Sequence, residues 1–166
     1  MGKDYLRIDD RLIHGQIVTA WCRALEIKEI IAIDDKLASN PTLQSIMMMG
    51  IPANYKHHVV TAEQARELFA APSEGNRLFV TRMPQDLKAI RQELLKCEIV
   101  FIGNAAKRPD TKFNLTKGGG GVLFVSTEDV KLFDELSAEG IKVVAQTVPN
   151  TPARPWPEIR KSIKAL

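Results

Sequence analysis

The sequence predicts an α/β fold: a single domain built on an open, mainly parallel β-sheet of about seven strands, with helices on both faces. Short apolar segments alternate along the chain with segments of helical periodicity. The strand segments are apolar on both faces, which is typical of parallel strands that are covered on both sides. The chain has 166 residues, 45% of them hydrophobic, so residues 1–166 are expected to form one domain with its own core.

The expected strands are short runs of apolar residues, and turn-forming residues or helical patterns separate them. Val, Ile, Phe and Tyr dominate most of these runs, as they do in strands generally. The run that starts at Glu98 ends at Gly103, where we expect the chain to leave the sheet. In chain order, the predicted strands are residues 5–8, 29–33, 56–60, 78–81, 98–102, 122–125 and 141–147.

The expected helices are identified by their periodicity and by the residues at their ends. In the first of them, Ile17, Trp21 and Ala24 recur on one face. Asn40 and Ser126 are suitable N-caps, and the segment Thr61 to Gln64 has the pattern of a capping box. The helices are predicted at residues 14–25, 41–49, 61–70, 84–96 and 126–140, and a short helix is expected after Pro157.

Composition and charge argue against several classes of function. The net charge of +3 is small and evenly spread, so the sequence does not predict nucleic-acid binding. Cys22 and Cys97 lie in separate apolar segments, which is typical of buried thiols in a reducing cytosol. No apolar run approaches the roughly 20 residues that span a bilayer, and no signal-peptide core or metal-ligand spacing is present. We therefore expect a cytoplasmic protein without a metal site.

The C-terminal tail is locally basic. From Arg154 onward it contains four basic residues and one acidic residue, Glu158. The simpler interpretation is a solvated helix face, and the alternative is a docking patch for an acidic partner.

The loop after the first strand is the predicted functional site. Ligands bind open α/β sheets at the carboxyl ends of the strands, near a switch in strand order. In this chain that loop is Asp9 to Ile13, within the polar string "RIDDRLIHGQ" at residues 7–16. The string brings two carboxylates, an arginine and a histidine together, which is more charge than one turn requires.

Within this string, His14 and Arg11 are the predicted reactive pair. His14 is expected at the start of a helix, where free N–H groups bind phosphate and the helix dipole disfavours the cationic imidazole. Arg11 can direct two N–H donors at phosphoryl oxygens. A neutral ring beside such a clamp is suited to accept and donate a phosphoryl group.

The neighbouring polar residues have two interpretations. Asp9 or Asp10 can hold Arg11 or the imidazole in place, and Gly15 lets backbone approach closely. Alternatively, the string is a capped turn, in which an aspartate caps the helix, Arg11 pairs with it and His14 is incidental. The sequence alone leaves open which carboxylate does the holding.

Several segments of the chain resemble one known family. "RIDDRLIHGQIVTAW" closely resembles the signature of the IIB components of the mannose/sorbose family of the bacterial sugar phosphotransferase system (PTS). The resemblance covers most of the chain, through the segments "IIAIDDKLASNP", "GIPANYKHHVVTAEQA", "LFVTRMPQDLKAI" and "EGIKVVAQTVPN".

The resemblance implies a phosphotransferase that acts as a phosphocarrier. His14 would take a phosphoryl group from the phosphohistidine of a IIA protein or domain. It would pass that group to a sugar held by the membrane partners IIC and IID. Arg11 would clamp the phosphate, and no metal or organic cofactor would take part. The protein would be cytoplasmic and associated with the inner face of the membrane through its partners. The other residues expected to shape the site are Asp9, Asp10, Leu12, Ile13, Gly15 and Gln16.

Two departures from the family pattern affect the surroundings of this loop. Members commonly have N-[IV]-G-G-M after the fifth strand, whereas residues 101–121 are "FIGNAAKRPDTKFNLTKGGGG", with a glycine run that we expect to form a hairpin-like turn. Some members place a second arginine on the helix after the second strand, but residues 41–55 contain no basic residue. A second cation would then come from Arg82, Lys107 or Arg108.

Two classes of function therefore stay open. The intact string around His14 favours a phosphocarrier enzyme subunit. The altered region 103–121 favours a non-catalytic regulatory or binding module that kept the fold. The sugar cannot be inferred from this chain, because the resemblance implies that the membrane partners select it.

Overall fold

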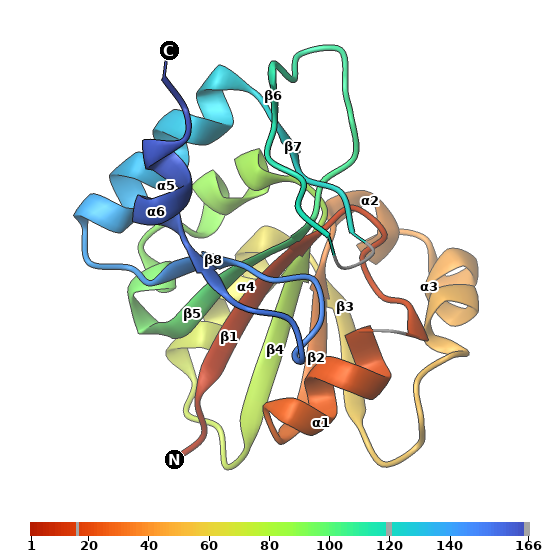
Figure 1. Ribbon diagram of the computed structural model, residues 1–166. Coiled ribbons are helices and arrows are strands. Elements are labelled where there is room, and N and C mark those ends of the chain that lie inside the picture. The colour runs from red at the N-terminus through yellow and green to blue at the C-terminus, as the bar shows by residue number, and fades with distance from the viewer. Residues whose placement is uncertain (16, 119–120, 165–166) are drawn as a thin grey trace.

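One seven-stranded sheet forms the centre of the computed structural model, which describes residues 1–15, 17–118 and 121–164 (Figure 1). All neighbouring strands pair in parallel except the last two, which are antiparallel. This open, mainly parallel sheet confirms the predicted fold class. In spatial order the strands are β3 (Lys56–Val60), β2 (Ile27–Ile33), β4 (Asn76–Thr81), β1 (Asp4–Asp9), β5 (Cys97–Asn104), β8 (Val143–Ala145) and β9 (Arg154–Pro155).

Helices cover both faces of the sheet, and each face buries its own apolar cluster. One cluster receives side chains from α4 (Ala62–Ala70), the 3₁₀ helices η2 (Pro84–Ile90) and η3 (Glu93–Lys96), α5 (Thr127–Ala138) and α6 (Trp156–Lys161). The other receives them from the π-helix η1 (Ile17–Trp21), α1 (Cys22–Ala24), α2 (Asp35–Ala38) and α3 (Pro41–Met48). In Figure 1, α1 lies in front of the sheet and α4 behind it.

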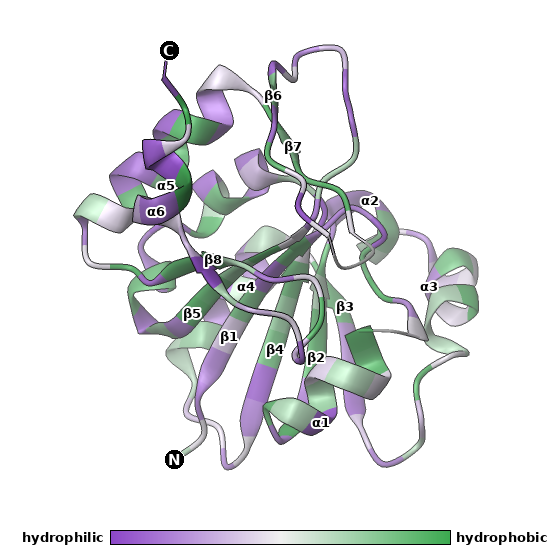
Figure 2. Cartoon of the chain, in the orientation of Figure 1, coloured by the Kyte–Doolittle hydropathy of each residue, from purple (hydrophilic) through white to green (hydrophobic). Residues whose placement is uncertain are grey.

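The strands feed both clusters because successive side chains of a strand point to opposite faces. Leu78 of β4 belongs to one cluster and Phe79 to the other, and both are fully buried. Figure 2 shows the hydrophobic colouring concentrated in the central strands. Within the described part of the chain, no helix is long and apolar enough to cross a membrane.

Three of the predicted helix starts are confirmed by their capping hydrogen bonds. The side chain of Asn40 accepts a hydrogen bond from the backbone N–H of Leu43 at 3.1 Å. The capping box between Thr61 and Gln64 is complete, with both reciprocal hydrogen bonds present. Ser126 forms a second such box at the start of α5. These local signals were sufficient to place α3, α4 and α5 from the sequence.

The strand predicted at residues 122–125 is not part of the main sheet. Only Phe124–Val125 (β7) is a strand, and it pairs antiparallel with Phe113–Asn114 (β6) in a separate hairpin. The backbone N–H of Val122 is bound by the side chain of Asn104 at 3.1 Å, which draws this segment across the end of β5. β9 occupies the edge of the sheet instead. Gly119 and Gly120, in the predicted glycine turn, lie outside the described residues.

Two predicted helices differ in type from the structure. Residues 84–96 form η2 and η3 rather than one α-helix. In the segment 14–25, the described helix is η1 followed by the short α1. The sequence analysis also missed α2, whose N-cap is Asp34; its side chain accepts from the backbone N–H of Leu37 at 2.9 Å.

Candidate functional site

The sheet topology brings the carboxyl ends of β1, β4 and β5 together. β1 lies between β4 and β5, and its pairing sets Ile8 beside Thr81 and Asp9 beside Asn104. The segments that follow these strands therefore leave the sheet at neighbouring points, as expected at a switch in strand order. The loop after β1, which carries the predicted site, passes close to α2 in Figure 1.

Asp9 is the carboxylate that holds Arg11. Its side chain is fully buried at the end of β1. Oδ1 accepts hydrogen bonds from the backbone N–H of Arg11 at 3.0 Å and from its Nε at 2.9 Å, and Oδ2 accepts from Nη2 at 2.9 Å. This paired contact fixes the plane of the guanidinium and raises the pKa of Arg11. The side chain of Arg11 is 36% exposed, so part of the guanidinium faces solvent.

Asp10 has a different role, because it joins the loop to the end of β5. Its Oδ1 accepts from the side-chain amide of Asn104 at 2.7 Å, and its Oδ2 accepts from the backbone N–H of Ala106 at 2.8 Å. The altered region after β5 therefore contacts the loop through backbone and amide groups. The choice between Asp9 and Asp10, which the sequence left open, is settled in favour of Asp9 for holding Arg11.

Arg82 also reaches the loop, from the end of β4. Its Nη1 donates to the backbone carbonyl of Asp10 at 3.1 Å, and its Nε donates to the carboxylate of Asp34 at 2.7 Å. The N-terminal N–H groups of α2 and Arg82 together hold the pKa of Asp34 below its usual value, against the effect of burial. Of the three candidates for a second cation, Arg82 is the one that binds the loop directly.

Leu12 reverses the chain direction within the loop. Its φ of 61° lies in the left-handed region, which costs a non-glycine residue about 1 kcal/mol or more. Its backbone N–H donates to the carbonyl of Asp9 at 2.9 Å, and its side chain is fully buried. Ile13 is buried in the same apolar cluster. Burial of two large apolar side chains, at roughly 2 kcal/mol each, more than offsets this backbone strain and anchors the loop.

His14 lies at the start of the helix, as predicted. Its carbonyl accepts the backbone N–H of Val18 at 3.3 Å. The imidazole is 24% exposed, and its Nε2 is buried 3.7 Å from Oδ2 of Asp9 without a hydrogen-bond partner among the described residues. Gly15 is exposed, and a Cβ added there would meet nothing within 4 Å. Gln16, the last residue of the predicted site, lies outside the described residues.

The pKa of His14 is lowered below its ordinary value of 6.5. Burial of the ring is the largest cause, and the positive charge of Arg11 is the second; the carboxylate of Asp9 acts in the opposite direction. The direction agrees with the prediction from the sequence, but the cause differs, since the helix dipole was expected to dominate. A neutral, nucleophilic imidazole at neutral pH follows.

Arg7 is a site residue that the sequence analysis missed. It projects from β1 and is 1% exposed, with Nη1 and Nη2 donating to the carbonyls of Gln146 and Thr147 at 2.9 and 2.8 Å. Its guanidinium lies 5.0 Å from the centre of the Trp21 ring and 3.6 Å from the carboxylate of Asp9. Burial lowers the pKa of Arg7 to about 10, so it stays charged at neutral pH. The available signal was an arginine inside an apolar strand.

Lys107 and Arg108 do not contact the reactive pair. Nη2 of Arg108 donates to the buried carboxylate of Asp129 at 2.6 Å, and its Nε lies 3.2 Å from Asp110. The guanidinium is thereby held at the N-terminal end of α5. Lys107 is exposed. Across residues 1–15, 17–118 and 121–164, neither side chain forms an ion pair or hydrogen bond with His14.

Chemically, the loop combines a neutral imidazole, a guanidinium fixed beside it and a buried carboxylate between them. Such a set can bind and transfer an anionic group without a metal. Among the described residues, no group of three histidine, cysteine or carboxylate side chains is placed to hold a metal ion. Burial raises the pKa of the Cys22 thiol to about 12, which makes this cysteine a poor nucleophile.

Solved structures share the fold of this chain. The chain superposes on the crystal structure of the IIBSor domain of the sorbose permease from Klebsiella pneumoniae with a TM-score of 0.84. The two chains are 26% identical, and the alignment covers 99% of this chain and 100% of that one. The protein therefore has the fold of a PTS IIB domain.

The family assignment is equally direct. The family model described as "PTS system sorbose subfamily IIB component" matches residues 4–165, and the chain belongs to that family. It is 28% identical to the sorbose-specific EIIB component of Klebsiella pneumoniae over 89% of this chain and 88% of that protein. It is also 28% identical to the mannose-specific EIIAB component of Escherichia coli, over 88% of this chain but only 44% of the longer protein.

Proposed function

We propose that the protein is a phosphocarrier that accepts a phosphoryl group on His14 from the phosphohistidine of a IIA component. It then passes the group to a sugar bound by IIC and IID membrane partners, while the chain itself stays on the cytoplasmic side and works as one domain over residues 1–166. Membership of the IIB family supports the general role of phosphotransferase. The name of the E. coli relative, EIIAB, supports a IIA partner.

The observation that carries the proposal is the position of the His14 ring. Its Nε2 is buried and faces Asp9, so Nδ1 is the nitrogen left to meet a phosphoryl donor. With a proton on Nε2 and a lone pair on Nδ1, the ring can attack the phosphorus atom of the donor. The new P–N bond forms as the P–N bond to the donor histidine breaks. The donor ring, which carries a proton on its other nitrogen, takes back the electron pair of the broken bond and leaves as a neutral imidazole, while the His14 ring keeps its proton on Nε2.

Charge stabilisation would come from the residues around the ring. The imidazole gains positive charge as it takes the phosphoryl group, and the carboxylate of Asp9 at 3.7 Å stabilises that charge. Arg11, held by Asp9, would neutralise the phosphoryl oxygens. We propose Arg82 as the nearest further cation, because it already binds the backbone of the loop. This chemistry requires no metal or organic cofactor.

The direct test is phosphorylation of the purified chain by a phosphorylated IIA protein. Mass spectrometry at alkaline pH should find one phosphate, on His14, that is stable to base and labile to acid. The variant His14→Gln should fold normally and take up no phosphate. Phosphate on His57, His58 or a cysteine would refute the assignment. Absence of any phosphate would favour the non-catalytic regulatory or binding module.

A further inference from the structure

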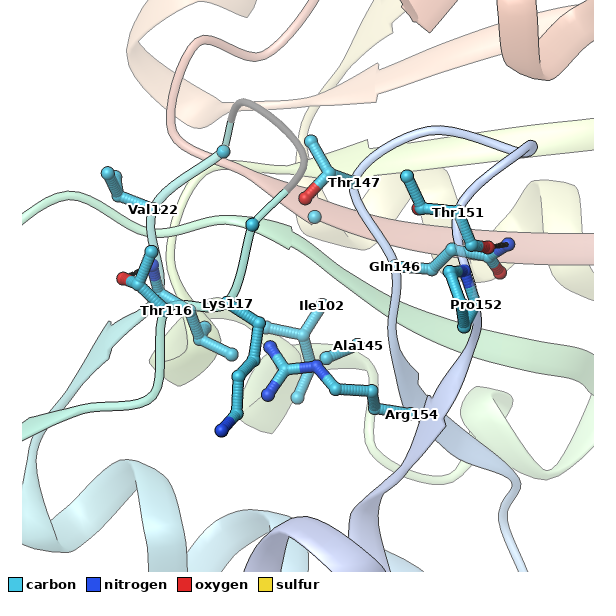
Figure 3. A pocket seen from close by; sticks show the side chains of 14 residues that line it. Ile102, Thr116, Lys117, Val122, Ala145, Gln146, Thr147, Thr151, Pro152 and Arg154 are labelled. Atoms are coloured by element: carbon cyan, nitrogen blue, oxygen red, sulfur yellow. Dashed lines mark hydrogen bonds between the residues drawn. The ribbon is translucent and has the colours of Figure 1, made fainter.

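A cavity lies between residues 116–118 and 121–123 on one side and residues 146–154 on the other, next to the ends of β5 and β8 (Figure 3). Its volume is about 150 Å³. Thr116, Lys117 and Gly118, which belong to the segment where the sequence departs from the family pattern, supply part of its wall. The phosphocarrier proposal gives this cavity no role.

Two cations share one end of the cavity. Figure 3 shows the side chains of Lys117 and Arg154 close together there. Arg154 is fixed by a hydrogen bond from its Nη2 to the carbonyl of Leu115 at 3.0 Å, and its partial burial lowers its pKa. No carboxylate is among the described residues that line the cavity. Two like charges side by side repel unless an anion lies between them, so this end is suited to a negatively charged group.

The opposite end of the cavity is neutral and polar. Figure 3 shows Thr147 and Thr151 away from the two cations. The hydroxyl of Thr151 donates to the carbonyl of Val148 at 2.7 Å, which leaves its oxygen free to accept. The Thr147 hydroxyl makes no hydrogen bond within the described part of the chain. Such groups match the hydroxyls of a polyol rather than an apolar ligand.

We propose that this cavity binds a small phosphorylated polyol, with its phosphate between Lys117 and Arg154 and its hydroxyls toward Thr147 and Thr151. The volume of about 150 Å³ suits a small compound of this kind, such as glycerol 3-phosphate. The inference stands on the cavity alone and does not depend on the phosphocarrier role.

The cavity is connected to the His14 loop through Arg7. The carbonyls of Gln146 and Thr147, whose residues line the cavity, both accept hydrogen bonds from Arg7. Arg7 in turn lies 3.6 Å from Asp9, which holds Arg11. A ligand that shifts residues 146 and 147 would therefore move Arg7, and through Arg7 it would affect Asp9 in the His14 loop.

The test is a titration of the ¹⁵N-labelled chain with glycerol 3-phosphate, inorganic phosphate and neutral glycerol. We expect both phosphates to shift the amide signals of Lys117 and Arg154, glycerol 3-phosphate alone to shift that of Thr147 as well, and glycerol to have no effect. Lys117→Gln should weaken the binding of both phosphates about tenfold. Thr147→Val should weaken the binding of glycerol 3-phosphate severalfold and leave that of inorganic phosphate unchanged, because only the polyol contacts this hydroxyl.

Lys112→Gln is the matched control, because Lys112 lines an adjoining cavity, which Lys117 and Arg154 also line, but does not line this one. It should change affinity less than twofold. Equal losses in the Lys112 and Lys117 variants, both abolished by high salt, would show a diffuse basic surface for an acidic partner and overturn the proposal. Changes in amide signals that are confined to residues 9–15 would also overturn the proposal. Phosphorylation of His14 is measured separately in Lys117→Gln. The result for ligand binding can then be judged whether or not His14 carries a phosphoryl group.

Discussion

Asp9 and Arg11 are joined by three hydrogen bonds of 2.9–3.0 Å although only one residue separates them. One of these bonds comes from the backbone of Arg11 and two come from its guanidinium. The left-handed conformation of Leu12 turns the next residues back, so that Nε2 of His14 also lies near the same carboxylate, at 3.7 Å. A single buried carboxylate therefore holds the proposed clamp and lies beside the proposed nucleophile.

Removal of the clamp should slow the chemistry far more than it affects folding. We expect Arg11→Ala to reduce the rate of His14 phosphorylation by about 10³-fold or more, as loss of a charge clamp does in other phosphoryl transfers. The fold should persist, with a loss of about 1–2 kcal/mol in the free energy of unfolding because Asp9 loses two hydrogen bonds. Quench-flow phosphorylation and urea unfolding measure the two effects. Arg23→Ala, an exposed arginine on α1, is the control and should change neither.

The reactivity of His14 should persist to lower pH than that of an ordinary histidine. Burial and Arg11 lower its pKa below 6.5, so the neutral ring is lost only as pH falls through this lowered value. In Arg11→Ala one of these causes is absent, and the pKa should rise. NMR titration of the His14 ring in both proteins checks the direction, and the His57 signal reports sample integrity. An unchanged or lower midpoint in the variant would show that Arg11 does not act on the ring.

The free energy of unfolding should depend on pH because the pKa of His14 is lowered in the folded chain. Below about pH 6.5 the unfolded chain binds a proton at His14 that the folded chain binds less readily, so acid should favour unfolding. His14→Gln should reduce this part of the pH dependence, which urea unfolding at several pH values would detect.

The sequence was sufficient to locate the proposed reactive loop because the information there is local. His14 follows the first strand and begins a helix, and Arg11 is only three residues away. Arg7 was missed for the opposite reason: its partners, Gln146 and Thr147, are about 140 residues distant in the chain. No short-range pattern distinguishes a buried arginine with distant partners from a solvated one.

The errors in the predicted fold also arise from contacts between residues that are far apart in the chain. Residues 122–125 have a strand-like composition, but whether they join the main sheet depends on Asn104, which binds Val122 from another element. The two-residue strand β9 joins the edge through its pairing with β8 alone. Helix ends were easier, because capping at Asn40 or Ser126 involves side chains within three residues of the helix start.

Arg108 should be structural rather than part of the transfer chemistry. Its guanidinium binds the buried carboxylate of Asp129 at 2.6 Å, so Arg108→Ala should cost about 2–3 kcal/mol in unfolding free energy and leave the rate of His14 phosphorylation unchanged. Lys107→Ala, at the exposed neighbouring position, should change neither quantity. A large loss of rate in either variant that persists at high salt would instead place the region in contact with the phosphoryl group.

Gly103 is required by the packing of Arg7. A Cβ at this position would overlap the Arg7 guanidinium. A surface arginine would avoid the Cβ by changing its side-chain conformation. Arg7 is 1% exposed and hydrogen-bonded to two carbonyls, so it cannot adopt another conformation without breaking these bonds. Gly103→Ala should therefore lower the free energy of unfolding by about 3 kcal/mol.

Gly50→Ala is the matched control, because a Cβ there meets nothing within 4 Å. Its free energy of unfolding should stay within about 0.5 kcal/mol of the parent. Equal stability of the two variants in urea unfolding would show that Arg7 is free to move, and would remove the proposed link between the cavity and Asp9.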